Sequence, residues 1–170
     1  MREHWLFKRL SAASKPIIPV PKEFYTNPLY FIAFGFGAGF APFAPGTFGT
    51  LFAIPFYLLL RQLSLPYYLL VVLIIIGLTS WMCDYISRKT HTHDHPGMCI
   101  DEFVGYFVTM INAPHGVFWI LLGFALFRLF DIWKPWPIRY LDKHVHGGFG
   151  MIIDDVVAGI FAMIIIQLLS

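Results

Sequence analysis

The sequence predicts an all-α protein, a small polytopic membrane helical bundle of about four to five hydrophobic helices, some short or re-entrant. Three observations favour this fold class. Hydrophobic residues make up 58% of the 170 residues, charged residues only 13%, and the mean hydropathy is +0.67. The apolar residues lie in long runs, and the loops between the runs alternate between rich and poor in Lys and Arg. No basic face with interleaved aromatic residues is visible, so nucleic acid is not an expected partner.

The apolar residues form five segments after an N-terminal tail: residues 47–60, 66–83, 103–111, 117–130 and 151–169. A helix needs about 20 apolar residues to span a bilayer, and the second and fifth segments approach this length. The first segment could begin inside the Gly-rich stretch before it, and the third as early as Met98. The third and fourth, joined by NAPHG, are candidates for a shallow helical hairpin. We expect one membrane domain over residues 27–170 and a cytosolic tail over residues 1–26.

The distribution of charge predicts how the chain is oriented in the membrane. Cytosolic loops are enriched in Lys and Arg, so the N-terminus and loops 84–102 and 131–150 are expected in the cytosol. Eight of the ten acidic residues lie between Asp84 and Asp155. They fall on the cytosolic side or at helix ends that face it, as does the Gly-rich loop 35–50. An active site that faces the cytosol is therefore expected.

Asp101 and Glu102 open the third segment, directly after the histidine-rich stretch HTHDHPGMCI. Two acids in the first turn of a helix are often capping and dipole partners. The alternative is a carboxylate pair that holds a hard cation such as Mg²⁺. The histidines lack the spacing of a helix-borne zinc motif, so substrate contact or proton transfer by His93 or His95 is the favoured interpretation.

Asp131 and Lys134 end the fourth segment, where Pro135 and Pro137 stop the helix. Their i, i+3 spacing lets the two side chains face the same way. They form either a local ion pair with no catalytic role or a metal-ligand aspartate beside a lysine that holds an anion. A lysine is a suitable point charge for a phosphate group.

Asp154 and Asp155 come one turn into the fifth segment, after the stretch HGGFGMII. They are either solvated acids of the first turn or functional groups, and acids within apolar helices are functional candidates because their burial is costly.

A Gly-Thr stretch, GFGAGFAPFAPGTFGT, precedes and opens the first segment. It matches neither a Walker loop nor a dinucleotide-binding loop. Its small residues suit close helix packing. Equally, its backbone N–H groups and threonine hydroxyls suit an anion at a helix start. The candidate substrate-binding residues here are Gly46, Thr47, Gly49 and Thr50.

Four stretches together resemble bacterial phosphatidylglycerophosphatase A: GAGFAPFAPGTFGT from Gly37, HDH from His93 with DEF from Asp101, FRLFDIWKPWPIR from Phe127, and HGGFGMIIDDVVAG from His146. The resemblance covers the chain from about Asn27 onward. It implies a Mg²⁺-dependent lipid phosphatase of the bacterial cytoplasmic membrane. Such an enzyme converts phosphatidylglycerophosphate to phosphatidylglycerol and phosphate, a step that supplies phosphatidylglycerol and cardiolipin.

The resemblance and the one-sided acids suggest roles for the candidate residues. The expected Mg²⁺ ligands, one of which would also serve as a base for water, are Asp101, Glu102, Asp131, Asp154 and Asp155. Lys134, with Arg139, would hold the phosphomonoester, and the Gly-Thr stretch the phosphodiester. His93 or His95 would protonate the departing glycerol oxygen.

Signatures of other phosphatases are missing from the chain. No Asp-x-Asp-x-[Thr/Val] or Cys-x5-Arg pattern occurs, and Cys83 and Cys99 are expected as thiols outside any disulfide. A metal-bound water is then the simplest nucleophile. The rival functions are a small proton-coupled transporter that uses Asp154 and Asp155 as a relay, and a non-catalytic membrane scaffold.

Overall fold

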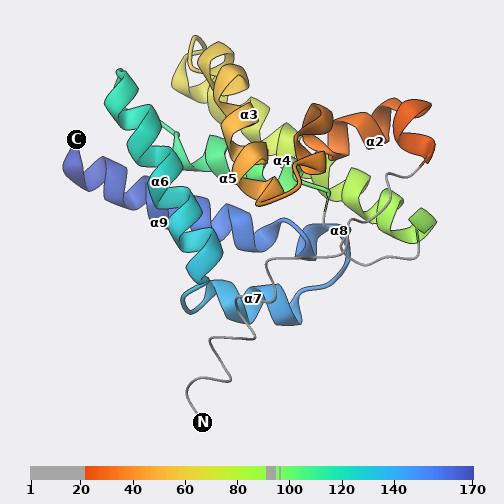
Figure 1. Ribbon diagram of the computed structural model, residues 1–170. Helices are drawn as coiled ribbons and strands as arrows, with labels where there is room; N and C mark the ends of the chain where they lie inside the picture. Colours follow the sequence, from red (N-terminus) through yellow and green to blue (C-terminus); the bar gives the residue numbers. More distant parts are fainter. Residues whose placement is uncertain (1–21, 91–94, 96) are drawn as a thin grey trace.

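The computed structural model describes residues 22–90, 95 and 97–170, and it is built from helices (Figure 1). In chain order these are η1 (Lys22–Tyr25), α2 (Pro28–Ala33), η2 (Gly35–Phe40), α3 (Pro45–Leu60), α4 (Leu65–Thr90), α5 (Ile100–Thr109), α6 (Val117–Trp133), α7 (Ile138–His144), α8 (Gly147–Gly150) and α9 (Ile153–Leu169). No strand occurs among these residues. The all-α prediction is confirmed, while most of the expected tail, residues 1–21, lies outside the described part.

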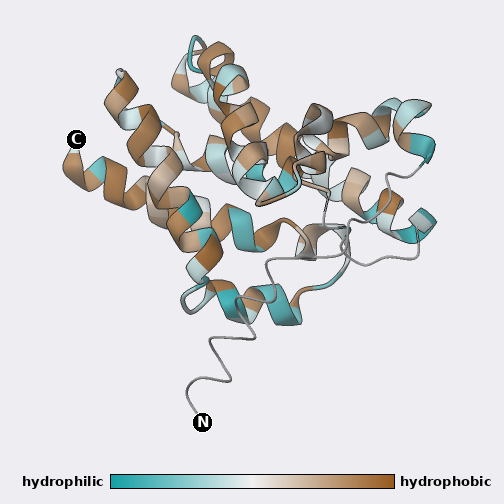
Figure 2. Ribbon diagram, viewed as in Figure 1, coloured by the Kyte–Doolittle hydropathy of each residue, from teal (hydrophilic) through white to brown (hydrophobic). Residues whose placement is uncertain are grey.

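Two helical stretches are long and apolar enough to cross a membrane, Leu65–Thr90 and Gly147–Leu169. The first leaves large apolar side chains such as Leu70, Leu73 and Leu78 more than half exposed. Extended apolar surface of this kind is uncommon on proteins that work in water. Figure 2 shows hydrophobic residues along most helices and hydrophilic residues on α7 and the adjacent part of α9. The arrangement is that of a small helical membrane protein.

The short helix α5 forms the centre of the bundle. Every residue from Phe103 to Thr109 is buried, and the helix packs against α3, α4, α6 and most extensively against α9. The sequence makes segments 103–111 and 117–130 candidates for a shallow hairpin, but α5 is surrounded instead of lying beside α6 alone. Its burial explains why ten residues suffice, because other helices, not lipid, cover its ends.

Glycines allow the close contact between α5 and α9. A Cβ atom on Gly159 of α9 would lie 2.4 Å from the carbonyl oxygen of Gly105 on α5, and one on Gly105 would lie 2.9 Å from the carbonyl oxygen of Asp155 on α9. Small residues let helix backbones approach in this way and gain van der Waals contact. The contact holds the start of α9, with its two acids, against the start of α5.

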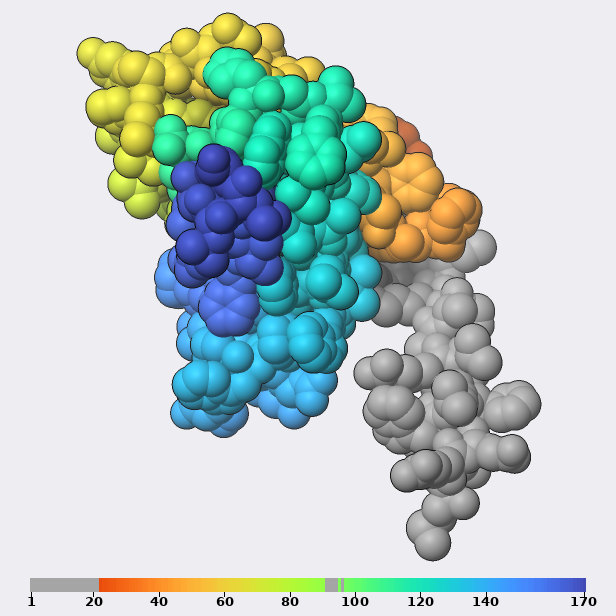
Figure 3. Space-filling model, turned by 90° about the vertical axis from the view of Figure 1, so that its left-hand side faces the viewer, coloured from red at the N-terminus to blue at the C-terminus, as the bar shows by residue number. Residues whose placement is uncertain are grey.

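The ends of the helices lie at two opposite sides of the molecule. The connection between α3 and α4 lies at one end, and α7 lies at the other (Figures 1 and 3). Lys134 caps α6 in a left-handed conformation, with φ of 46°, and so turns the chain into α7. The end that carries α7 therefore also collects the last turn of α6 and the first turn of α9.

We predict that Gly159→Ala lowers the thermal unfolding temperature in detergent. The added methyl group meets backbone, which cannot rotate away, so the helices must separate at a cost of about 1–3 kcal/mol. Gly77→Ala in α4 is the matched control, because nothing beyond the neighbouring residues and the backbone of its own helix lies within 4 Å of the position that its Cβ would take. A wild-type unfolding temperature for Gly159→Ala would show that this contact does not constrain the bundle.

Candidate functional site

A cavity of about 470 Å³ lies where the starts of α3, α5 and α9 meet the end of α6. Its wall carries five of the predicted metal ligands and both cations of this region. The polar lining residues are Asp101, Glu102, Arg128, Asp131, Lys134, Asp142, Asp154 and Asp155. Acids and cations from four helices that are distant in sequence therefore share one pocket, as the one-sided charge distribution predicted.

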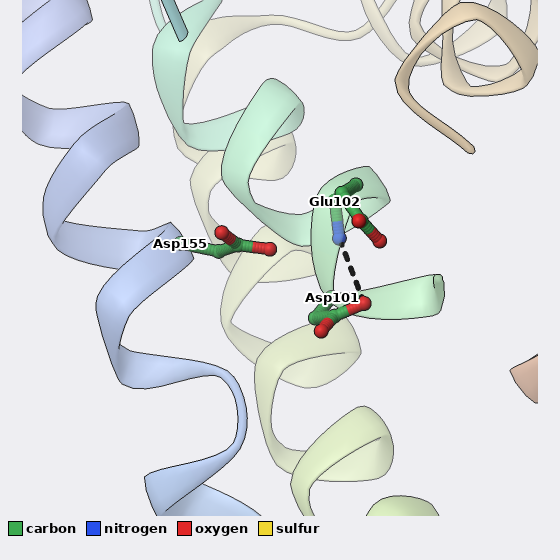
Figure 4. A group of neighbouring side chains, drawn as sticks. All are labelled: Asp101, Glu102 and Asp155. Carbon is green, nitrogen blue, oxygen red and sulfur yellow. Dashed lines mark hydrogen bonds between the residues drawn. The ribbon is translucent and has the colours of Figure 1, made fainter. Parts of the chain in front are cut away.

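The first acid group consists of Asp101, Glu102 and Asp155. Figure 4 shows Asp155 on α9 pointing toward the first turn of α5, which carries the other two. One carboxylate oxygen of each residue lies within 4.8 Å of the others. The backbone N–H of Glu102 donates a hydrogen bond to Oδ1 of Asp101, which is the capping role that a first-turn acid can play. Capping and cation binding are thus compatible here.

The second acid group consists of Asp131, Asp154 and Asp155, again with oxygens within 4.8 Å of one another. Asp155 belongs to both groups and joins them. Carboxylates this close repel one another unless protons, cationic side chains or a metal ion compensate their charge. The cationic side chains therefore decide how much charge is left for a metal ion to balance.

Arg128 is the site residue that the sequence analysis did not single out. Its Nη1 lies 2.6 Å from Oδ2 of Asp131 and 3.8 Å from Oε1 of Glu102, with the three side chains only 13–14% exposed. Its Nε is buried without a hydrogen-bond partner among the described residues. The i, i+3 spacing of Arg128 and Asp131 inside an apolar helix is the signal that could have found it.

Lys134 does not pair with Asp131, its predicted neighbour. Its Nζ donates hydrogen bonds to Asp154 at 2.7 Å and to Asp142 at 2.9 Å. Burial alone would lower the pKa of Lys134, but these two carboxylates outweigh it and raise the pKa. The left-handed turn after α6 explains the change of partner, because it points the lysine toward α9. Lys134 is thus a permanent cation in the cavity wall.

The carboxylates fit a divalent cation. Oε2 of Glu102 is buried with no hydrogen-bond partner among the described residues, and burial raises the pKa of this carboxyl to about 8. A buried carboxylate oxygen needs a positive partner to stay ionised. Two oxygen-rich groups joined by Asp155 match the ligand preference of Mg²⁺ for carboxylates.

The other predicted residues are placed differently. His93 lies outside the described residues. His95 is buried against the Phe34 ring, its Nδ1 accepts a hydrogen bond from the Gly97 N–H, and it does not line the cavity. Arg139 lines a neighbouring cavity instead. The structure therefore does not bring His95 or Arg139 to the acid cluster.

Both interpretations of the Gly-Thr stretch, helix packing and a place in the site, apply to it, but to different residues. Gly46 lines the cavity, and a Cβ atom there would lie 2.1 Å from Oε1 of Glu102. Thr50 is buried and its hydroxyl donates to the Gly46 carbonyl, while Gly49 packs on Cys99. Thr47 is half-buried and is not part of the cavity lining. Helix packing therefore accounts for Gly49 and Thr50, and close approach to the acids accounts for Gly46.

Both cysteines are buried, and neither forms a disulfide, as predicted. Burial raises the pKa of the Cys99 thiol, and the carboxylates of Glu102 and Asp101 raise it further. A thiol held in the neutral form is a poor nucleophile. Cys99 is therefore a packing residue at the start of α5.

The comparisons with known proteins agree with the motifs. The family model described as phosphatidylglycerophosphatase A matches residues 31–170. The chain is 43% identical over 138 residues to phosphatidylglycerophosphatase A of Escherichia coli K12, covering 81% of this chain and 80% of that protein. It is 41% identical over 150 residues to the Haemophilus influenzae protein of the same name, covering 87% and 92%.

A third relative has a different name. A Bacteroides thetaiotaomicron protein, provisionally named phosphatidylinositol-3-phosphatase, is 34% identical over 142 residues, covering 79% of this chain and 89% of that protein. No solved structure matches the chain.

We predict that Arg128→Met destabilises the protein in metal-free detergent solution. The substitution keeps much of the side-chain volume but leaves Asp131 without its close cation, and breaking a buried ion pair costs about 3–5 kcal/mol. Arg88→Met is the control, since Arg88 forms an exposed pair with Asp84 and such pairs contribute less than about 1 kcal/mol. Equal unfolding temperatures for the two variants would contradict the role given to Arg128.

Proposed function

The chain belongs to the phosphatidylglycerophosphatase A family, and from this premise we propose that it hydrolyses phosphatidylglycerophosphate to phosphatidylglycerol and inorganic phosphate. That it is a phosphatase follows from the family. The observation that supports this proposal is the cavity in which six carboxylates, five of them the predicted metal ligands, meet Arg128 and Lys134. The reaction would serve the synthesis of phosphatidylglycerol and the lipids made from it.

The two cations of the cavity suit a phosphomonoester. Arg128 presents a planar fork of N–H donors and Lys134 a point charge, and both bind phosphate oxygens well. They form ion pairs with Asp131, Asp154 and Asp142. A phosphate group entering the cavity would therefore find its donors already oriented, and it would compete with carboxylates for them.

We propose Mg²⁺ as the cofactor, held by the two groups that share Asp155. The ligands would be Asp101, Glu102, Asp131, Asp154 and Asp155, with Asp131 also paired to Arg128. The ion would supply a Lewis acid for the phosphate oxygens and would lower the pKa of water. The protein's own part is to hold its carboxylates ionised and close together, and to shield them within the bundle.

We further propose that the cavity faces the cytosol in the bacterial cytoplasmic membrane. The basic loops at the α7 end support this orientation through the positive-inside rule, and two helices have the length and apolarity to span the bilayer. The lipid head group would then meet the cavity at the membrane surface. The acyl chains would stay among the lipids, which suits a cavity placed at a helix end.

The transporter interpretation receives less support. Asp154 and Asp155 line the same cavity as Asp101 and Asp131, so they belong to one cluster at one end of α9. A relay in a carrier places its charges near the membrane midplane. A scaffold without catalysis gives no reason for gathering six carboxylates in one pocket, where their mutual repulsion is costly.

We expect the purified protein in nonionic detergent to release phosphate from phosphatidylglycerophosphate with added Mg²⁺ and to stop when EDTA is added. Chelation should remove the activity, because the ion would supply the Lewis acid and the charge compensation that the side chains cannot. Phosphatidate and phosphatidylinositol 3-phosphate should be run in parallel. A folded, Mg²⁺-loaded sample that hydrolyses none of the three would reject the proposal and favour the transporter.

Asp131→Asn should lower turnover more than about 100-fold, because loss of a metal ligand costs at least as much as the roughly 10–100-fold loss seen for outer-shell partners. The amide keeps the shape of the side chain, and Arg128 keeps Glu102 as a second carboxylate. We therefore expect a folded protein with a lower unfolding temperature, because the buried ion pair with Arg128 is lost. Mn²⁺ binding, measured as the rise in unfolding temperature that the ion causes, should weaken in parallel. Asp84→Asn is the control, because Asp84 pairs with the exposed Arg88 and lies outside the cavity. Normal turnover by Asp131→Asn would refute the ligand assignment.

A further inference from the structure

A second cavity lies beside the acid cluster and has the opposite charge. Its volume is about 530 Å³, and three cations line it, Lys134, Arg139 and Lys143. No carboxylate of the described residues belongs to its wall. Trp133 and Trp136, which are 62% and 81% exposed, form its apolar side. A basic and aromatic pocket next to an acidic one indicates a ligand with an anionic part and a lipid part.

The two cavities meet at Lys134, which lines both of them. Its ammonium group is already held on the acid side by Asp154 and Asp142. Arg139 and Lys143 have no ion pair among the described residues and stand at i, i+4 on α7, so they share one face of that helix. These two residues are therefore the cations available to a ligand in the second cavity.

The proposed substrate carries two phosphate groups, and only one of them reacts. The terminal phosphomonoester is hydrolysed, whereas the phosphodiester joins the head-group glycerol to the diacylglycerol and leaves unchanged with the product. With the monoester in the acid cavity, the diester must lie within one glycerol unit of it. It must also lie toward the lipid, where the exposed indoles of Trp133 and Trp136 suit the membrane interface.

We propose that Arg139 and Lys143 bind the phosphodiester of phosphatidylglycerophosphate, so that the second cavity selects this lipid over phosphatidate, which has a monoester and no diester. The inference rests on the proposed function. It also replaces the sequence-based expectation that the Gly-Thr stretch holds the diester and Arg139 the monoester. Thr50 is buried with its hydroxyl bonded to Gly46, and Arg139 does not reach the acid cavity.

The division of labour has a physical reason. Arg128 and Lys134 are closely paired with carboxylates, so they discriminate poorly between one phosphomonoester and another. Arg139 and Lys143 would gain a partner only from a ligand that has a second anionic group. Charge-assisted hydrogen bonds from such cations to phosphate are among the strong ones in proteins. Selectivity between lipids would thus reside in α7, outside the acid cluster.

The test is steady-state kinetics of Arg139→Gln, Lys143→Gln and the double variant in nonionic detergent micelles with Mg²⁺. The substrates are phosphatidylglycerophosphate and phosphatidate at matched surface concentration. For phosphatidylglycerophosphate we expect the apparent KM to rise about tenfold or more, since a hydrogen bond to a charged group is lost, with kcat nearly unchanged. For phosphatidate we expect neither constant to change.

Lys89→Gln is the matched control, because it removes one positive charge from an exposed position at the end of α4 and lies outside both cavities. It should leave both substrates unaffected.

Three results would overturn the inference. Equal losses on both lipids would mean that the cations serve the membrane surface or the fold, and unchanged kinetics would mean that they serve neither substrate. A loss in kcat alone would place them at the reacting group. If the wild-type protein itself fails to hydrolyse phosphatidylglycerophosphate, it is the proposed function that fails, so the two failures are distinguishable.

Discussion

The fold depends on compensating five carboxylates that meet at one end of an apolar bundle. Asp155 lies in both acid groups, and Arg128 and Lys134 each hold carboxylates on one side of it. Two cations cannot balance five acids and Asp142 as well. The remaining negative charge favours a divalent cation at the site. It also explains why the arginine is buried, because only a guanidinium close to Asp131 and Glu102 can offset their repulsion.

The packing of the helices serves this electrostatic arrangement. Carboxylates from α5, α6 and α9 converge only because α5 and α9 touch at Gly105 and Gly159. The α6 helix adds Arg128 and Asp131 from its last turns, and its left-handed end at Lys134 sends that side chain back toward α9. Backbone geometry and charge pairing are thus coupled. A change that separates α5 from α9 also separates the acids that share Asp155.

The sequence was sufficient for the fold class, the family and the gathering of acids on one face, because each depends on composition, hydrophobic runs or long motifs. It was insufficient for pairings that depend on three-dimensional packing. Asp131 and Lys134 are suitably spaced for an ion pair, yet each has a partner elsewhere, since the helix ends between them. The sequence does not distinguish Arg128 from the other charged residues of its region, because its burial depends on how the helices pack. The histidine-rich pattern around His95 predicted substrate contact or proton transfer, but His95 packs on Phe34.

The separation of the two cavities suggests how one catalytic cluster can serve lipids with different head groups. In the proposed function, the acid cavity would receive only the phosphomonoester, which is the part common to all such substrates. The neighbouring basic cavity is built almost entirely from the end of α6 and from α7, a short segment joined to the bundle through Lys134 and its partners Asp142 and Asp154. Substitutions in α7 can therefore alter recognition of the head group while the carboxylates stay in place. Lys134 is the one described residue that lines both cavities. In this proposal it would therefore couple the choice of lipid to the reacting phosphate.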